Sequence, residues 1–122
     1  MIDNTDVSQT EFYDTKQLAQ KLDVTFEWLK TNRKRGKSPI PYRKIGPFVR
    51  YSKKEILSWI GRKDLELEFY SPQTLAKMLD LTVNWLNHNR VSNNPIPFRR
   101  FGRVVRYNKT EVQSWLNKEN KS

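Results

Sequence analysis

The first regular pattern along the chain is a set of apolar residues at helical spacing. Thr15 precedes this apolar face, and its hydroxyl can cap the start of a helix. The face consists of Leu18, Ala19 and Leu22. After a turn at residues 23–24, Thr25 can cap a second helix at Phe26–Arg35, and Gly36 marks the end of that helix. The pattern therefore predicts two short helices joined by a turn of about three residues.

The pattern becomes that of short strands after Pro41. Residues 42–45 and 48–51 are typical of two strands that flank a turn at Gly46-Pro47. Ser52 can then cap a last helix. One face of that helix carries Ile56, Trp59 and Ile60. The predicted order is helix, turn, helix, hairpin, helix.

The same pattern occurs twice in the chain. Phe12-Tyr13 returns as Phe69-Tyr70 at an offset of 57 residues. One residue is then missing from the second copy, and Val49-Arg50-Tyr51 returns as Val105-Arg106-Tyr107 at an offset of 56. The gap falls in a polar turn, where changes of length cost little. Such self-similarity predicts two copies of one structural unit.

The second copy predicts the same elements as the first. Ser71-Pro72 opens its first helix, and Thr82 can cap its second helix. Residues 98–101 and 104–107 form the expected hairpin, after which Asn108 can cap the last helix. The apolar face of that helix is Val112, Trp115 and Leu116.

These elements predict an α+β fold, mainly α with small β-hairpins, repeated in tandem. The expected divisions are a disordered N-terminal tail at 1–10, a first copy at 11–61, a junction at 62–68, a second copy at 69–117 and a C-terminal tail at 118–122. The junction contains Leu65 and Leu67, which have polar counterparts before the first copy. We expect these leucines to pack in an interface between the two copies.

Composition indicates the kind of partner. The 122 residues include 23 Lys and Arg against 13 Asp and Glu, a net charge of +10 that attracts polyanions. Nucleic acid is the first expectation, and an acidic membrane surface is the weaker one. No stretch approaches the roughly 18 apolar residues of a membrane span, and the polar start lacks the pattern of a secretion signal. With no Cys, the chain fits a reducing cytoplasm and has no thiolate metal site.

Tryptophan and histidine add two alternatives. The four tryptophans, Trp28, Trp59, Trp85 and Trp115, could stack on the bases of a single strand. Helical spacing from apolar neighbours favours a place in the core instead. His88 is the only histidine, so we expect no metal and no cofactor.

Several motifs together resemble one family of DNA-binding proteins. They are Leu-Asp-Val-Thr before a basic helix, Pro-x-x-Lys-Ile-Gly and Val-Arg-Tyr in the hairpin, and Glu-x-x-x-Trp-Ile at the end. This string resembles the excisionase-type winged helix-turn-helix family of the MerR-like group, which includes phage and plasmid regulators. The resemblance covers nearly all of Phe12–Ile60 and Phe69–Leu116. Family members commonly have one copy, so the tandem arrangement is a departure. A pre-joined dimer and two different half-sites both remain open.

The resemblance implies that the second helix of each copy enters a major groove and that the hairpin, or wing, follows a minor groove or the backbone. Residue chemistry agrees, because residues 30–54 hold ten Lys and Arg and no acidic residue. The candidate recognition residues are Thr25, Glu27, Lys30, Thr31, Arg33 and Lys34 in the first copy, and Thr82, Asn84, Asn87, His88 and Arg90 in the second. The candidate backbone contacts are Arg43, Lys44, Arg50, Arg99, Arg100, Arg103 and Arg106. Because Glu27 is replaced by Asn84, the two copies are expected to prefer different half-sites.

The expected function is sequence-specific binding of double-stranded DNA by a protein of a bacterial mobile element. It would act in the nucleoid as a transcriptional regulator or as an excisionase, with RNA polymerase or an integrase as a partner, and its oligomeric state on DNA stays open. The alternatives are a plasmid replication or partition factor, a basic protein-interaction module and a binder of RNA or single strands. An enzyme is not expected, because the chain has no Gly-rich phosphate loop, no Cys and no paired His.

Overall fold

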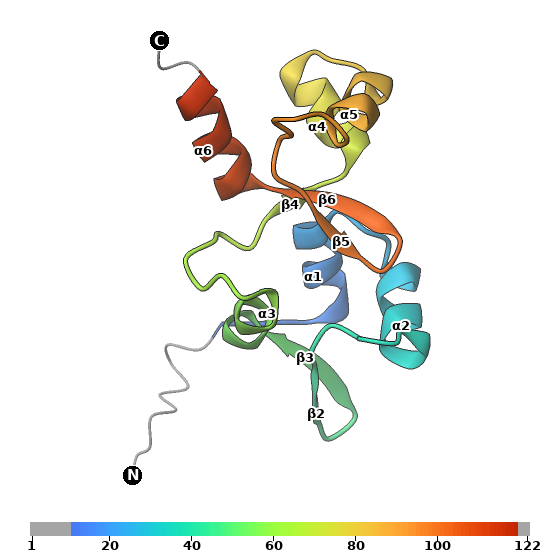
Figure 1. Ribbon diagram of the computed structural model, residues 1–122. Coiled ribbons are helices and arrows are strands. Elements are labelled where there is room, and N and C mark those ends of the chain that lie inside the picture. The colour runs from blue at the N-terminus through green and yellow to red at the C-terminus, as the bar shows by residue number, and fades with distance from the viewer. Residues whose placement is uncertain (1–10, 120–122) are drawn as a thin grey trace. The chain divides into compact units, whose positions relative to one another are not determined.

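The computed structural model describes residues 11–119 (Figure 1), and the chain divides into two compact units between Asp64 and Leu65. Each unit has the same order of elements: a strand, two helices, a hairpin and a final helix. The described residues thus form a mixed α+β protein with six helices and two three-stranded antiparallel sheets. The predicted fold class is confirmed at this level, and so is the repetition of one pattern.

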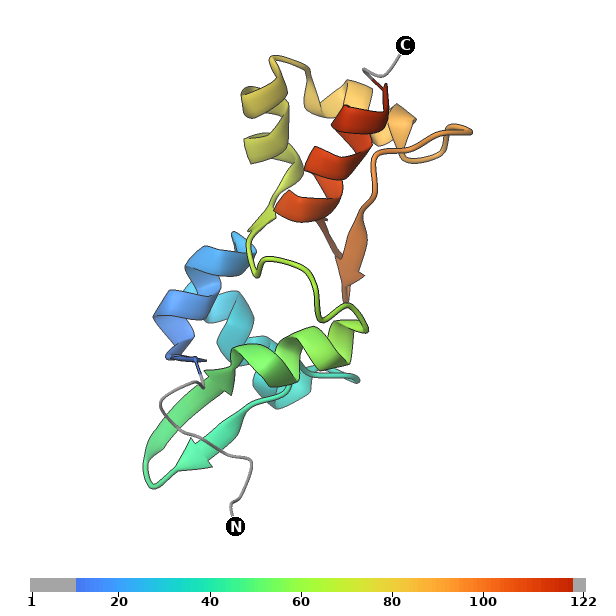
Figure 2. The ribbon, with the colours of Figure 1, turned by 90° about the vertical axis from the view of Figure 1, so that its left-hand side faces the viewer.

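The first unit is built around a small sheet with the strand order β1-β3-β2. Its elements are β1 (Phe12–Tyr13), α1 (Thr15–Leu22), α2 (Phe26–Arg35), β2 (Arg43–Ile45), β3 (Phe48–Ser52) and α3 (Lys53–Ile60). Helices α1 and α2 pack against each other, and α1 also packs on β3. The β2–β3 hairpin projects from the helices of its own unit, as Figures 1 and 2 show.

The second unit repeats this topology with the strand order β4-β6-β5. Its elements are β4 (Phe69–Tyr70), α4 (Pro72–Leu79), α5 (Val83–Asn89), β5 (Arg99–Phe101), β6 (Val104–Asn108) and α6 (Lys109–Glu119). Its core cluster consists of Leu75, Ala76, Leu86, Ile96, Val105, Tyr107 and Val112. One apolar face from each helix and the inner side of the hairpin therefore meet in a single small core.

A short first strand in each unit was missing from the predicted order. Phe12 lies opposite Ser52 and Tyr13 opposite Tyr51, so β1 extends the hairpin to three strands. The backbone N–H of Lys53 donates to the Glu11 carbonyl at 2.9 Å and continues this pairing into the start of α3. Two residues are too few to show an alternating pattern, which explains why the sequence revealed Phe12-Tyr13 only as a repeat.

The cap of the first helix differs from the prediction. Asp14, not Thr15, is the N-cap of α1, and its carboxylate accepts a hydrogen bond from the Gln17 N–H at 2.7 Å. The Gln17 side chain accepts in return from the Asp14 N–H at 3.0 Å, so the two residues form a capping box. In the second unit Ser71 caps α4 as predicted, and Pro72 occupies the first turn.

The turns between the paired helices need a special backbone conformation. Asp23 (φ 56°) and Asp80 (φ 55°) end α1 and α4 in the left-handed region, which aspartate tolerates better than most residues. Thr25 and Thr82 cap the following helices as predicted.

Gly36 ends α2 as predicted, but with φ at −67°, so a left-handed conformation is not what requires glycine there. A Cβ at this position would lie 2.6 Å from the Asn32 carbonyl oxygen.

The prediction that the tryptophans are core residues is wrong for two of them. Trp59 is 37% exposed and Trp85 is 44% exposed. Trp28 and Trp115 are half-buried, and Trp115 packs against the core cluster. Leu, Ile and Tyr side chains fill the centre of each unit, and a unit of this size has little room to enclose a whole indole.

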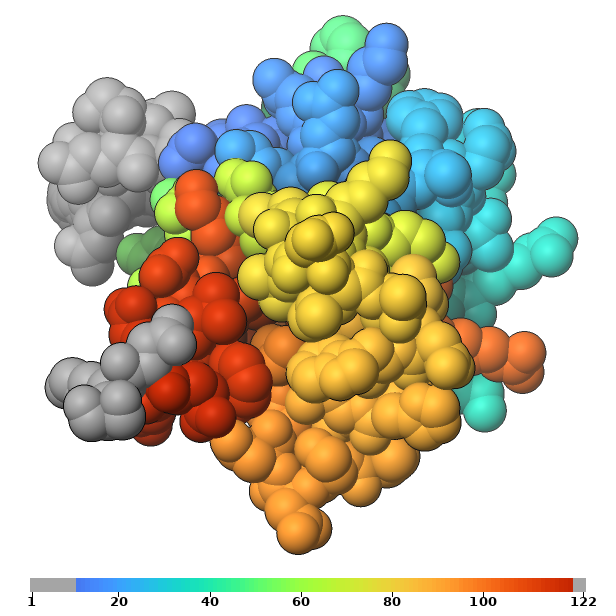
Figure 3. Space-filling model, turned by 90° about the horizontal axis from the view of Figure 1, so that it is seen from above, coloured from blue at the N-terminus to red at the C-terminus, as the bar shows by residue number. Residues whose placement is uncertain are grey.

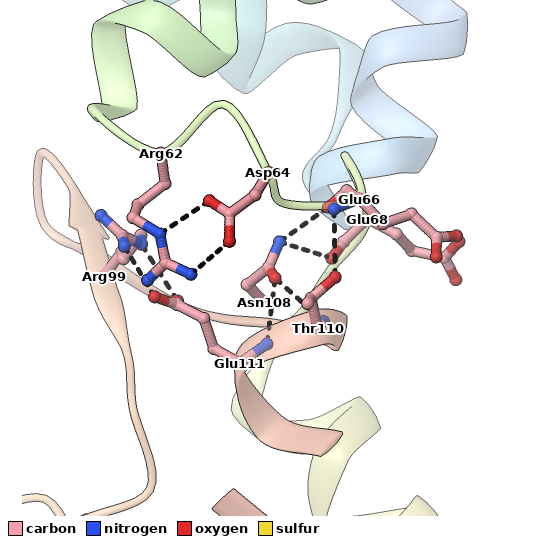
Figure 4. A network of polar contacts seen from close by, with 8 residues as sticks. All are labelled: Arg62, Asp64, Glu66, Glu68, Arg99, Asn108, Thr110 and Glu111. Atoms are coloured by element: carbon pink, nitrogen blue, oxygen red, sulfur yellow. Dashed lines mark hydrogen bonds and ion pairs between the residues drawn. The ribbon is translucent and has the colours of Figure 1, made fainter. Parts of the chain in front are cut away.

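The segment after Asp64 is attached to the second unit. The Glu66 N–H donates to the Thr110 hydroxyl at 3.0 Å, and the Asn108 side-chain amide donates to the Glu66 carbonyl at 2.8 Å (Figure 4). Leu65 and Leu67 are buried. The second half of the predicted junction is therefore no free tether, while an interface between the units through these leucines stays a prediction.

The structure describes only part of the expected chain ends. Helix α6 continues to Glu119, two residues beyond the predicted end of the second copy. The predicted tail at 1–10 and the remainder of the C-terminal tail at 120–122 lie outside the described residues. Within residues 11–119, no helix has both the length and the apolar character needed to cross a membrane.

Candidate nucleic-acid interface

The second helix of each pair is anchored by a buried leucine and an asparagine. Leu29 of α2 and Leu86 of α5 are fully buried. One turn later, Asn32 Oδ1 accepts a hydrogen bond from the Ile40 N–H at 3.0 Å, and Asn89 Oδ1 does the same for the Ile96 N–H at 2.9 Å. Each asparagine thereby ties the loop that leads to the hairpin back onto the helix. Sequence analysis missed this role, although Asn32 and Asn89 lie 57 residues apart, the offset at which Phe12-Tyr13 repeats.

Two predicted recognition residues face the interior of their units. Arg33 Nη1 donates to the Tyr51 hydroxyl at 2.8 Å, and Arg90 Nη1 donates to the Tyr107 hydroxyl at 2.9 Å. Both tyrosines are fully buried. Burial raises the pKa of Tyr51, while the Arg33 guanidinium acts in the opposite direction.

The helical spacing holds a signal that identifies these arginines. Arg33 follows the buried Leu29 by four residues, and Arg90 follows Leu86 by four, so each pair shares one helix face. Arg33 and Arg90 therefore hold α2 and α5 on their units instead of projecting from them.

The other recognition candidates lie mainly on the opposite face. In α2, Glu27, Thr31 and Lys34 are exposed at spacings of four and three residues, which forms one polar stripe. Lys30 is half-buried, with its Nζ 5.4 Å from the centroid of the Phe26 ring. Thr25 is exposed at the N-cap, where its hydroxyl accepts from the Trp28 N–H.

Helix α5 presents an uncharged counterpart of this stripe. Asn84, Asn87 and His88 are exposed, and Thr82 is exposed at the N-cap. The α4–α5 segment, coloured yellow to gold, faces the viewer in Figure 3. Asn87 Oδ1 accepts from Arg90 Nη2 at 2.6 Å, so the inward-facing arginine also orients this amide.

The hairpins place arginines directly opposite one another. Arg43 pairs with Arg50 across β2 and β3, and Arg99 pairs with Arg106 across β5 and β6. Like charges at directly opposite positions destabilise a sheet. The same pairing is present in both units, and in each pair one arginine also has a glutamate partner, Glu55 for Arg43 and Glu111 for Arg99.

Local contacts hold each of the four arginines in place. Arg43 forms an ion pair with Glu55, which raises the arginine pKa, and Arg99 pairs with Glu111 at 2.7 Å (Figure 4). Nη1 of the other arginine in each hairpin donates to a neighbouring carbonyl oxygen, from Arg50 to Val49 at 2.8 Å and from Arg106 to Val105 at 2.7 Å. Contacts within the chain thus orient all four guanidinium groups.

The remaining candidate cations on the hairpins are Lys44, Arg100 and Arg103. Lys44 and Arg100 lie on the faces of their hairpins opposite to the paired arginines, and Arg103 lies in the turn of the second hairpin. All three side chains are exposed. The fold therefore presents cations on both faces of each hairpin and at the end of α2, while Arg33 and Arg90 are separated from this group.

The described part of the chain contains no cluster of three or more His, Asp or Glu side chains arranged to hold a metal ion. Comparison of the chain with models of known protein families, with curated proteins and with solved structures found no match.

Proposed function

We propose that this protein is a sequence-specific binder of double-stranded DNA, and that each unit is a winged helix-turn-helix module. The observation that carries the proposal is the two-sided construction of α2 and α5. Leu29 and Leu86 are buried on one side, and polar stripes are exposed on the other. A rigid helix with a free polar face, next to a basic hairpin, suits the width and the charge of a major groove.

The exposed stripes are the proposed readers of base edges. Glu27 can accept a hydrogen bond from a cytosine amine, whereas Asn84 can bond adenine through both its donor and its acceptor. Thr31 is matched by His88. Because the stripes differ in this way, the two units read different half-sites. The inward-facing Arg33 and Arg90 support the readers and make no base contact in this proposal.

The hairpins supply contacts to the phosphate backbone. The proposed contacts are Lys44, Arg100 and Arg103, with support from Arg43, Arg50, Arg99 and Arg106. Arg43 and Arg99 are already paired with Glu55 and Glu111, so phosphates would add negative charge mainly beside Arg50 and Arg106. Binding would then release counterions and weaken steeply as the salt concentration rises.

The biological role follows from the resemblance to excisionase-type regulators. We propose a transcriptional regulator or excisionase of a bacterial mobile element, acting at the nucleoid beside RNA polymerase or an integrase. A DNA-bending assay with and without the integrase separates these two roles.

Selection from random duplexes, followed by fluorescence anisotropy of the recovered duplex, tests the central proposal. Changing Lys44 or Arg100 to Met is expected to reduce the slope of log K against log salt by about 0.9 each. Lys118→Met, which removes an exposed charge near the end of α6, is the matched control and should leave the slope unchanged. Asn84→Ala should instead change the preferred sequence. The proposal fails if the protein does not bind duplexes at low ionic strength.

The exposed Trp59 and Trp85 support a second candidate function, binding of single strands by stacking. The same anisotropy experiment with one strand of the selected duplex decides between the two. Tighter binding of the single strand, accompanied by quenching of tryptophan fluorescence, would favour this alternative.

A further inference from the structure

The turn of the first hairpin exposes two large apolar side chains. Ile45 and Phe48 lie directly opposite each other across β2 and β3, on either side of Gly46-Pro47. Ile45 is 53% exposed and Phe48 is 56% exposed. Apolar residues at the end of a projecting hairpin add little to the core of the unit, so their position calls for another explanation.

Cations lie directly behind this apolar tip. Because side chains alternate along a strand, Arg43 and Arg50 share the face that carries Ile45 and Phe48. The Arg50 guanidinium lies 5.2 Å from the centroid of the Phe48 ring. The surface is therefore an apolar end bordered by positive charge, which complements a stack of bases bordered by phosphates.

The second hairpin has a different tip. Phe101 occupies the position of Ile45, is only 4% exposed, and packs edge-on against Phe69 with the ring centroids 5.3 Å apart. Val104 replaces Phe48 and is half-buried, while the exposed Arg103 replaces Pro47. The second tip therefore presents charge where the first tip presents apolar surface.

We propose that the first hairpin is a wedge: Ile45, Pro47 and Phe48 enter the minor groove and partly unstack one base step, while the second hairpin only grips the backbone. This inference rests on the proposed function and deepens it, because it assigns DNA bending to one unit. Inserted apolar side chains kink a duplex toward its major groove by roughly 20–90°. Arg50 would neutralise a phosphate beside the opened step, whereas Arg43 is already paired with Glu55.

The test measures unstacking and bending separately from binding. The probe is the duplex recovered by selection, with the fluorescent base 2-aminopurine placed at each step of the site in turn and with dyes at the two ends to report bending. Wild-type protein should raise the fluorescence at one step and shorten the distance between the ends. Phe48→Ala should lose most of both signals, and Phe48→Leu should keep them. Val104→Ala, the same position in the second hairpin, is the matched control and should keep them as well.

The outcomes distinguish the wedge from the general proposal. Because Phe48 is exposed, its variants should keep the wild-type circular dichroism spectrum. Duplex binding without any rise in fluorescence, or full signals from Phe48→Ala, would overturn the wedge alone. Absence of duplex binding by the wild type would overturn the proposed function and the wedge together. Self-association that Phe48→Ala abolishes in sedimentation, with bending unchanged, would assign the tip to a second copy of the chain instead.

Discussion

Replacement of Arg33 by Met tests whether this arginine supports the fold or contacts DNA. The variant keeps a long apolar stem but removes the hydrogen bonds to the Tyr51 hydroxyl at 2.8 Å and to the Thr15 hydroxyl at 3.3 Å. It also removes the guanidinium from its place 5.8 Å from the centroid of the Tyr42 ring. The buried Tyr51 hydroxyl would then lose its charged donor.

The expected cost follows from these contacts. A hydrogen bond that involves a charged group contributes about 1.5–3 kcal/mol, and leaving a buried polar group unsatisfied costs a similar amount. Arg33 is only half-buried, so water can replace part of what is lost. We therefore expect the free energy of unfolding of the first unit to fall by about 2 kcal/mol, which corresponds to a roughly 30-fold change in its unfolding equilibrium.

Urea unfolding of Arg33→Met measures this cost, with the neighbouring Lys34→Met as the control. Lys34 is exposed, so its replacement should change stability by less than about 0.5 kcal/mol. In DNA binding the exposed Lys34 should matter more than Arg33. Lys34→Met should reduce the slope of log K against log salt by about 0.9, and folded Arg33→Met should leave that slope nearly unchanged. The reasoning is refuted if Arg33→Met unfolds like the wild type and reduces the slope as Lys34→Met does.

Three further predictions concern stability. Asn89→Ala should lower the free energy of unfolding by about 1–3 kcal/mol, because it leaves the buried Ile96 N–H unpaired; an unchanged urea midpoint would contradict the anchoring role. Asp80→Gly should be neutral or stabilising while Asp80→Val should destabilise by about 1 kcal/mol or more, since φ there is 55°; equal melting temperatures would count against this explanation. Burial and the nearby Glu11 raise the pKa of Tyr13 to about 12. The unfolded chain therefore releases this proton more readily than the folded one, so stability should fall as the pH rises from about 10 to 12. A spectrophotometric titration in which all tyrosines ionise together near their ordinary pKa would exclude this shift.

Capping residues and turn glycines were sufficient to predict the bounds of most helices and strands. Thr25 and Ser52 cap helices that begin where the sequence predicted, because a capping hydroxyl acts on the N–H groups of the next turn. The hairpins match within one residue at each strand end, because Gly46 and Gly102 adopt the positive φ of the predicted turns. The cap of α1 was misassigned by one residue, since Asp14 and Thr15 are both good capping residues and the choice depends on where the helix packs.

The candidate site was less predictable than the fold. Composition and repetition identified the basic segments, but charge alone does not say which way an arginine points. Arg33 and Lys34 are neighbours in sequence, yet one bonds a buried tyrosine and the other is exposed. The partner of Arg33 lies 18 residues away, and Tyr51 comes within its reach because α2 and β3 both pack on α1.

The sequence by itself determined the repeat, the order of most elements, the helix caps other than that of α1, and the positive charge, since these depend on neighbouring residues and on composition. Tertiary structure decided the addition of β1 and β4 to the hairpins, the inward direction of Arg33 and Arg90, and the exposure of Trp59 and Trp85. It also decided the contrast between the two hairpin tips, where Phe101 packs on Phe69 while Ile45 and Phe48 stay exposed. The spacing of Arg33 and Arg90 from Leu29 and Leu86 is a local signal for their direction. The other features depend on which distant side chains share a limited core, and no local pattern records that competition.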